Sequence, residues 1–391
     1  MKTGKGINVL HLARWYPNRY DPMFGLFVKR HIEAVSPFAS VTVVYAQKSE
    51  GKNGEKFSLE VIKEKNIVEI IVYYTVNNRS LPTVKFFRYL QAVKRGVDTA
   101  LDINGNKFDL IHVHILTRLG VVALFLKYLW GKPYVITEHW SRYQPVTGYY
   151  KGLFRKILTK IVVRKASAVT TVTRNLATAM KNRGLKNRYY SVLPNVIAPV
   201  FFKNVVKPVG DITRFIHVSC FEDRSKNISG ILRVVKMLSQ RRNDFRFSLI
   251  GVGADFEKMK DYARRLEIPQ GNIEFTGLLE GDNLVRKMAE GDMLVVFSNY
   301  ENMPVVINES FALGIPVVAT RVGGIPEIVD DNKGVLIEPG NEKQLFNVLN
   351  DFIDKKYSFD SKRIKDFAVN EFSYEAVGKQ ISGLYNKILK P

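Results

Sequence analysis

The sequence predicts an α/β protein with two Rossmann-like, doubly wound domains that face a cleft. Short, continuously apolar runs rich in β-branched residues alternate with longer amphipathic stretches, which is typical of buried parallel strands joined by helices. The pattern restarts near residue 215, after a stretch that contains Pro194, Pro199 and Pro208. The length of 391 residues accommodates two domains of ordinary size.

The apolar runs give the expected strands in chain order. In the first half they cover residues 7–13, 41–45, 67–74, 110–115, 134–137 and 168–172. In the second half they cover residues 215–219, 247–251, 272–275, 293–297, 316–319 and 334–337. The run at 7–13 follows a basic start and faintly resembles a secretion signal. Asn8 and His11 interrupt its apolar character, which favours a first buried strand.

The expected division places an N-terminal domain at residues 1–200, a C-terminal domain at 201–372 and a last helix at 373–391. That helix is amphipathic, and we expect it to pack back toward the N-terminal domain. No apolar run is long enough to span a membrane, since the longest, 121–126, is broken at Lys127. The single cysteine, Cys220, excludes an internal disulfide framework. These features favour a cytoplasmic protein.

Polar residues gather after the expected strand at 293–297. Glu301 lies on the loop, Asn302 is a candidate helix cap, Pro304 suits a first turn, and Glu309 lies about two turns into the helix. Free N–H groups at a helix start favour a phosphate, and carboxylates accept hydrogen bonds from sugar hydroxyls. The alternative is that both glutamates are merely solvated.

This region resembles the signature of the family 4 retaining glycosyltransferases, which have the GT-B fold. The resemblance rests on the Glu-x7-Glu element, on GIPVVAT at 314–320 and on GGIPEIV at 323–329. Similar landmarks are YP at 16–17, GLFVKR at 25–30, Pro194-Asn195 and Gly277, so the resemblance covers nearly the whole chain.

The resemblance implies roles for individual residues in binding the donor. Glu301 would contact hydroxyls of the donor sugar and Glu309 the nucleotide ribose. The intervening loop, formed by Asn302, Met303, Pro304 and Val305, would face the sugar or the phosphates.

A second loop follows the expected strand at 215–219. The family places an arginine and a lysine there to clamp the diphosphate, and Lys226 matches the lysine. Cys220 stands where the arginine usually lies, so Arg224 is a candidate replacement. The alternative is a solvated charge cluster.

In the N-terminal half, the resemblance assigns His139 to the donor sugar near the reaction centre. Otherwise His139 is a histidine satisfied by the backbone at a strand end. Gly25 would let the backbone approach a ligand at a helix start. His112 and His114 alternate on one strand face, where a buried hydrogen-bonded pair is favoured over a metal pair, and His114 is a candidate for the border of the acceptor pocket.

Cofactor and metal motifs are weak in this sequence. Gly251-Val252-Gly253 resembles part of a dinucleotide loop, but Phe256 replaces the third glycine, which favours a simple turn. No Asp-x-Asp occurs, so we expect a metal-independent site in which no cofactor is needed and the nucleotide diphosphate sugar is a substrate.

Lysine and arginine exceed aspartate and glutamate by 22. Residues 151–165 hold six basic and no acidic residues, with apolar residues at helical spacing, and a second cluster at 85–95 mixes aromatic and basic residues. Such surfaces favour an anionic membrane surface, the alternative being a core-facing helix with a solvated basic face. No nucleic-acid recognition motif accompanies the charge.

Taken together, the resemblance implies transfer of a hexose-type sugar, with retention, to a hydroxyl of a glycan or lipid-linked acceptor in cell-surface polysaccharide synthesis. The expected location is the cytoplasm, with the inner face of the membrane as a peripheral site. The alternatives are a nucleotide-sugar epimerase and a catalytically degenerate nucleotide-sugar-binding protein at the membrane surface. Phe256 disfavours a nicotinamide-dependent dehydrogenase.

Overall fold

The computed structural model describes residues 6–50, 55–203, 205, 207 and 210–390, which divide into two compact units. Unit 1 contains Met1–Val196 and Tyr374–Pro391, and unit 2 contains Ile197–Ser373. The chain therefore leaves unit 1 before residue 197 and re-enters it at residue 374. Residues 1–5, which form the basic start of the sequence, lie outside the described residues.

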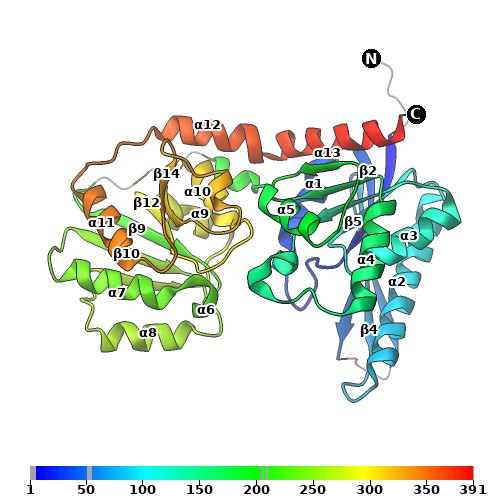
Figure 1. Ribbon diagram of the computed structural model, residues 1–391, viewed down its shortest axis with the longest axis horizontal. Helices are drawn as coiled ribbons and strands as arrows, with labels where there is room; N and C mark the ends of the chain where they lie inside the picture. The colour runs from blue at the N-terminus through cyan, green and yellow to red at the C-terminus, as the bar shows by residue number, and fades with distance from the viewer. Residues whose placement is uncertain (1–5, 51–54, 204, 206, 208–209, 391) are drawn as a thin grey trace. The chain divides into compact units, whose positions relative to one another are not determined.

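Unit 1 is built on an eight-stranded sheet with the order β3-β4-β2-β1-β5-β6-β7-β8 (Figure 1). All neighbouring strands are parallel except β3 and β4. The strands are β1 (Ile7–Ala13), β2 (Ala39–Ser49), β3 (Phe57–Glu64), β4 (Ile67–Thr75), β5 (Leu110–His114), β6 (Tyr134–Glu138), β7 (Ala168–Thr171) and β8 (Tyr190–Val192).

Helices cover both faces of this sheet. They are α1 (Leu26–Val35), α2 (Pro82–Asn104), α3 (Leu119–Trp130), α4 (Leu153–Lys165), α5 (Arg174–Asn182) and α13 (Tyr374–Leu389), with short 3-10 turns η1 (Ser141–Tyr143) and η2 (Pro145–Thr147). The connection through α1 runs from β1 to β2, whereas those through α2 and α3 run in the opposite direction along the sheet. Because parallel crossovers are right-handed, α1 lies on one face and α2 and α3 lie on the other.

Helix α13 returns to unit 1 and packs against α1, as the sequence indicated. Gly378 permits a close approach, since a Cβ there would lie 2.0 Å from the carbonyl oxygen of Ala34. Val377, Ile381 and Tyr385 are buried in the same hydrophobic cluster as α1. Among the described residues, no helix combines the length and the apolar character needed to cross a bilayer.

Unit 2 has a six-stranded, fully parallel sheet with the order β11-β10-β9-β12-β13-β14. The strands are β9 (Thr213–Val218), β10 (Phe245–Ile250), β11 (Ile273–Gly277), β12 (Met293–Val296), β13 (Val317–Thr320) and β14 (Gly334–Ile337). The helices are α6 (Asp223–Lys226), α7 (Ile228–Ser239), α8 (Phe256–Arg265), α9 (Gly281–Ala289), α10 (Val305–Ala312), α11 (Glu342–Ile353) and α12 (Ser361–Phe372), with 3-10 turns η3 (Pro199–Phe202) and η4 (Ile325–Glu327).

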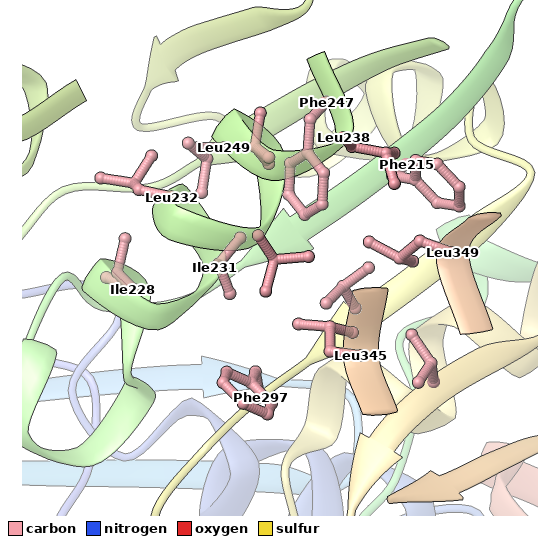
Figure 2. Close-up of a cluster of buried hydrophobic side chains, with 14 of the residues drawn as sticks. Phe215, Ile228, Ile231, Leu232, Leu238, Phe247, Leu249, Phe297, Leu345 and Leu349 are labelled. Atoms are coloured by element: carbon pink, nitrogen blue, oxygen red, sulfur yellow. The ribbon is translucent and has the colours of Figure 1, made fainter. Parts of the chain in front are cut away.

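Two hydrophobic clusters pack on the sheet of unit 2. One joins α7, α8 and α11 to the strands, and Figure 2 shows Leu238 of α7 and Leu349 of α11 beside Phe215 of β9. The other joins α9, α10 and α12 to the strands. Buried residues on both faces explain why these strands are continuously apolar in sequence.

The twelve strands expected from the sequence are all present, and the run at 7–13 forms the buried strand β1. Two further strands, β3 and β8, were not expected. Strand β3 is antiparallel to β4 and lies at the sheet edge, where Lys63 and Glu64 are exposed and interrupt the apolar pattern. Strand β8 has only three residues, which is too short for a periodic signal.

Candidate functional site

The loops after β9 and β12 meet at the carboxyl edge of the unit 2 sheet, because these two strands are neighbours. The Nζ atom of Lys226, at the end of α6, lies 2.5 Å from Oε1 of Glu301. Ser298 Oγ donates to the same oxygen at 3.0 Å. The backbone N–H of Asn299 donates to the carbonyl of Ser225 at 2.8 Å, which fastens the two loops together.

The pair of Lys226 and Glu301 is largely withdrawn from solvent, with side chains 18% and 10% exposed. Burial disfavours the charge on Lys226, but attraction and hydrogen bonding to Glu301 outweigh it and raise the pKa of the ammonium group. Lys226 is therefore a fixed cation at neutral pH. Glu301 therefore already neutralises part of the positive charge of Lys226 before an anionic ligand binds.

Helix α10 begins at Val305, and its N-cap residue is Pro304. The expectation that Asn302 caps this helix was wrong, because Pro304 remains extended (ψ 115°) and delays the helix beyond Asn302. The carbonyl of Asn302 instead accepts the N–H of Gly324 at 2.8 Å. Met303 is buried, whereas the side chains of Asn302 and Val305 are partly exposed.

Glu309 lies in the second turn of α10 and is buried, with 7% of its surface exposed. Its neighbours Asn308 and Ser310 are also fully buried. The interpretation of Glu309 as a merely solvated carboxylate is therefore wrong. A buried carboxylate near a helix start can accept hydrogen bonds from a hydroxyl-bearing ligand.

The stretch after β13 supports the loop that carries Glu301. Gly323 has φ +55°, and a Cβ there would lie 2.0 Å from the carbonyl oxygen of Glu301. Thr320 Oγ1 donates to the carbonyl of Ser298 at 2.6 Å. This close packing gives a physical reason for glycine in the 323–329 sequence.

Cys220 and Arg224, on the same loop region as Lys226, have exposed side chains. Arg224 lies on the single turn of α6, and its carbonyl accepts a hydrogen bond from Asn299 Nδ2 at 3.0 Å. Gly253 packs against the same loop, since a Cβ there would lie 2.5 Å from the backbone nitrogen of Phe221. The glycines at 251 and 253 thus allow two loops to meet, which agrees with the turn interpretation.

In unit 1, His139 follows β6 at the carboxyl edge of the sheet and is 8% exposed. The preceding residue, Glu138, holds the loop in place: its carboxylate accepts the backbone N–H groups of Leu116, His139 and Trp140 at 2.9–3.0 Å. Burial raises the pKa of Glu138 to about 7, although these hydrogen bonds lower it in part.

Five buried histidines from distant parts of the sequence gather at this edge. They are His11 on β1, His31 on α1, His112 and His114 on β5, and His139. His114 Nε2 lies 3.0 Å from His11 Nδ1, and its Nδ1 lies 3.3 Å from His139 Nε2. The sequence singled out His112, His114 and His139, but it gave no sign that these residues form one network with His11 and His31.

Hydrogen bonds satisfy His112, whose ring nitrogens lie 2.6 Å from Tyr385 Oη and 2.6 Å from Thr137 Oγ1. Burial lowers the pKa of His11 to about 3 and that of His31 to about 4. The imidazoles are therefore neutral at pH 7, which is the form that binds a metal ion. Nitrogen atoms of His11, His112 and His114 lie within 4.8 Å of one another, as do those of His31, His114 and His139.

Gly25 precedes α1 with φ +70°, and a Cβ there would lie 2.4 Å from the carbonyl carbon of Trp15. The ring of Phe27, in the first turn of α1, lies 4.9 Å from that of His139. Gly25 and His139 thus share the carboxyl edge of unit 1. The other candidates, from Arg224 to Glu309, belong to unit 2.

Comparisons with known proteins give matches over most of the chain. The family model of group 1 glycosyl transferases matches residues 203–368, and that of glycosyltransferase family 4 matches residues 40–200. N-acetyl-alpha-D-glucosaminyl L-malate synthase of Bacillus anthracis is 24% identical over 297 residues, 72% of this chain and 75% of that protein. The putative teichuronic acid biosynthesis glycosyltransferase TuaC of Bacillus subtilis is 23% identical over 358 residues, 87% of each chain.

Among solved structures, Anabaena HepE in complex with UDP and glucose has a similar fold. The TM-score is 0.71 with 18% identity, and the match covers 97% of this chain and 99% of that chain. At this level of identity the likeness concerns the fold alone.

Proposed function

Because the chain belongs to the group 1 glycosyltransferases of the GT-B fold, we propose that it transfers a hexose-type sugar from a nucleotide diphosphate sugar to a hydroxyl of a glycan or lipid-linked acceptor. The transfer proceeds with retention of anomeric configuration and serves cell-surface polysaccharide synthesis. The buried pair of Lys226 and Glu301 at the carboxyl edge of unit 2 is the observation that carries this proposal.

In the proposed donor complex, the diphosphate takes over Lys226 from Glu301. The leaving diphosphate gains negative charge as the sugar bond breaks, and a preorganised ammonium group stabilises that charge. Glu301 is then released to accept hydrogen bonds from the sugar hydroxyls. HepE has been solved with UDP and glucose, which supports a nucleotide-sugar donor for this fold.

The remaining donor contacts follow from the positions of the other candidates. Glu309, buried in α10, accepts from the ribose hydroxyls, and the loop from Asn302 to Val305 faces the sugar or the phosphates. Exposed Arg224 can swing onto the diphosphate in place of the arginine that Cys220 replaces. Gly25 lets the backbone of Trp15 pack directly against the start of α1, which is the part of unit 1 proposed to approach the ligand.

We assign no general base. The leaving phosphate takes the proton of the acceptor hydroxyl, so a neutral His139 has only to orient the donor sugar by hydrogen bonding. Burial lowers the pKa of His139 well below its usual range, which keeps the ring neutral. Charge neutralisation by Lys226 and helix amides makes the proposed reaction metal-independent, and the proposed location is the cytoplasm or the inner face of the membrane.

A panel of nucleotide sugars in a thermal-shift assay tests the donor site. A ligand at 100 times its Kd stabilises the protein by about 2.7 kcal/mol. We expect Glu309→Ala to abolish the shift given by the matching donor, whereas Glu371→Ala, an exposed glutamate on α12, leaves it unchanged. Glu301→Ala should reduce turnover more than binding.

Three results would reject the proposal. Turnover at the wild-type rate in both Glu301→Ala and Glu309→Ala would place the reaction elsewhere. Conversion of the donor to its epimer without any acceptor would identify an epimerase, and donor binding without any transfer would identify a degenerate binding protein.

A further inference from the structure

A long apolar groove lies within unit 1, on the sheet face opposite α1. Its volume is about 890 Å³, and it is lined by α2 on one side and by α3 and α4 on the other. Leu90, Val121 and Leu158 are typical of its walls. From Phe86 to Leu101 along α2 the groove extends about 22 Å, at 1.5 Å per helical residue.

The rim of this groove exposes large apolar side chains. Phe87, Phe125 and Phe154 are 63%, 64% and 78% exposed. Helix α4 buries only Thr159, Val162 and Val163, so the core-facing interpretation of residues 151–165 explains little of its apolar face. Contiguous exposed apolar surface of this kind marks a binding site.

Four arginines stand at one end of the groove: Arg14, Arg118, Arg142 and Arg155. Arg14 follows β1, Arg118 follows β5 and Arg142 follows β6, while Arg155 lies in the first turn of α4. Because parallel strands end at the same edge, these side chains gather where unit 1 also presents His139.

These four guanidinium groups form no ion pair with the described residues. Lys29 and Lys94 of the same unit, by contrast, form ion pairs with Glu69 and Asp98. Glu138 lies within electrostatic reach of Arg142, but its oxygens accept backbone N–H groups.

This arrangement costs free energy in the absence of a ligand. Burial lowers the pKa of Arg118, and repulsion from Arg14 and Arg155 lowers it further. Arg142 Nε is buried and finds no hydrogen-bond partner among the residues that the structure describes. Arg118 also holds φ at +64°, a strained conformation for a residue with a side chain.

We propose that the groove binds the hydrocarbon chain of a lipid phosphate or diphosphate, whose phosphate groups are held by the four arginines. This inference deepens the proposed function, because it makes the acceptor a sugar linked to such a lipid. Arginine binds phosphate oxygens in a bidentate manner, and the apolar walls bury the chain. Trp140 lines the groove and directly follows His139, so the sugar attached to the phosphate would lie beside His139.

Other occupants fit less well. A neutral lipid leaves the cluster of guanidinium groups uncompensated, and a soluble glycan leaves the apolar walls exposed to water. A flat bilayer surface would contact the exposed apolar rim but would not fill a groove of about 890 Å³.

Binding of farnesyl diphosphate to the intact protein, without any nucleotide sugar, tests the proposal. Trp130 and Trp140 line the groove, so their fluorescence reports occupancy. We expect farnesyl diphosphate to bind at least tenfold more tightly than either farnesol or inorganic pyrophosphate. The same affinity for farnesyl diphosphate and pyrophosphate would overturn the proposal.

Matched pairs of variants locate the site. Arg155→Gln and Phe125→Asp each change a lining residue and should weaken binding at least tenfold. Arg164→Gln on α4 and Tyr128→Asp on α3 change exposed residues outside the lining and should leave binding unchanged. Equal weakening by Phe125→Asp and Tyr128→Asp would indicate a general apolar surface instead of the groove, and would overturn the proposal.

The outcome is separable from that of the proposed function. Nucleotide-sugar binding by the Arg155→Gln and Phe125→Asp variants should match the wild type, because both positions lie in unit 1 and the donor residues Lys226, Glu301 and Glu309 lie in unit 2. If the wild type binds farnesyl diphosphate but no nucleotide sugar, the transferase assignment fails while the lipid site stands.

Discussion

Removing the ammonium group of Lys226 should destabilise unit 2 markedly. In Lys226→Met, the carboxylate of Glu301 remains only 10% exposed and keeps Ser298 Oγ as a side-chain donor. Breaking a buried ion pair costs about 3–5 kcal/mol, and a surface pair contributes about 0–1 kcal/mol. With one partner 18% exposed, we expect a loss of about 2–3 kcal/mol.

Differential scanning calorimetry measures this loss. For a unit of this size, 1 kcal/mol corresponds to about 2–4 °C in Tm, so the transition of unit 2 should fall by about 5–10 °C. The double variant Lys226→Met/Glu301→Gln should recover part of the loss, because it removes the uncompensated charge. Lys203→Met, which breaks an exposed pair with Asp282, should cost less than about 0.5 kcal/mol.

The double variant decides the question. If Lys226→Met is as stable as Lys226→Met/Glu301→Gln, the two charges are not coupled, and the assignment of Glu301 as a carboxylate held in reserve by Lys226 is refuted.

Two further predictions concern pH and backbone conformation. Burial lowers the pKa of His11 to about 3 and that of His31 to about 4. As the pH falls, these histidines are therefore protonated in the unfolded chain before they are protonated in the folded protein. Their contribution to the free energy of unfolding is fully present above pH 6.5 and is lost progressively below it. Each histidine should cost about 1.4 kcal/mol between pH 7.5 and pH 5.5, partly offset by the raised pKa of Glu138, which acts in the opposite direction. Urea unfolding followed by tryptophan fluorescence should show a lower midpoint at pH 5.5, and an unchanged midpoint would contradict the burial of this network. Gly323→Ala should destabilise unit 2 and weaken donor binding, because its Cβ would lie 2.0 Å from the carbonyl oxygen of Glu301. The control is Gly340→Ala, where φ is +72° and no described atom lies within 4 Å of the new Cβ. This variant should lose only the conformational free energy of about 1 kcal/mol. Equal calorimetric shifts for the two glycine variants would show that the Glu301 loop moves to accommodate the new Cβ at no cost, which would contradict this prediction.

Buried parallel strands were predictable because both of their faces must be apolar. The same reasoning misses β3, whose exposed edge position allows Glu60, Lys63 and Glu64 in a strand. It also misplaced the start of α10, since a capping residue such as Asn302 is only one of the competing local signals. Pro304, held in an extended conformation, set the boundary instead.

The donor loop was visible in sequence because Glu301 and Glu309 are close along the chain. The clusters in unit 1 were not, because their members come from several strands. Arg14, Arg118 and Arg142 are each unremarkable alone, and they meet only because β1, β5 and β6 end at one edge. The order of the strands in the sheet decides which of these residues meet, and no single residue indicates that order.

The return of α13 to unit 1 has a consequence for biosynthesis. During translation, residues 374–389 leave the ribosome after all of unit 2, yet Tyr385 Oη occupies the interior of unit 1 beside His112. Unit 1 therefore lacks α13, and α1 lacks its packing partner, until unit 2 has been synthesised. Unit 2 is continuous and can mature first, so the order of completion is the reverse of the order of synthesis.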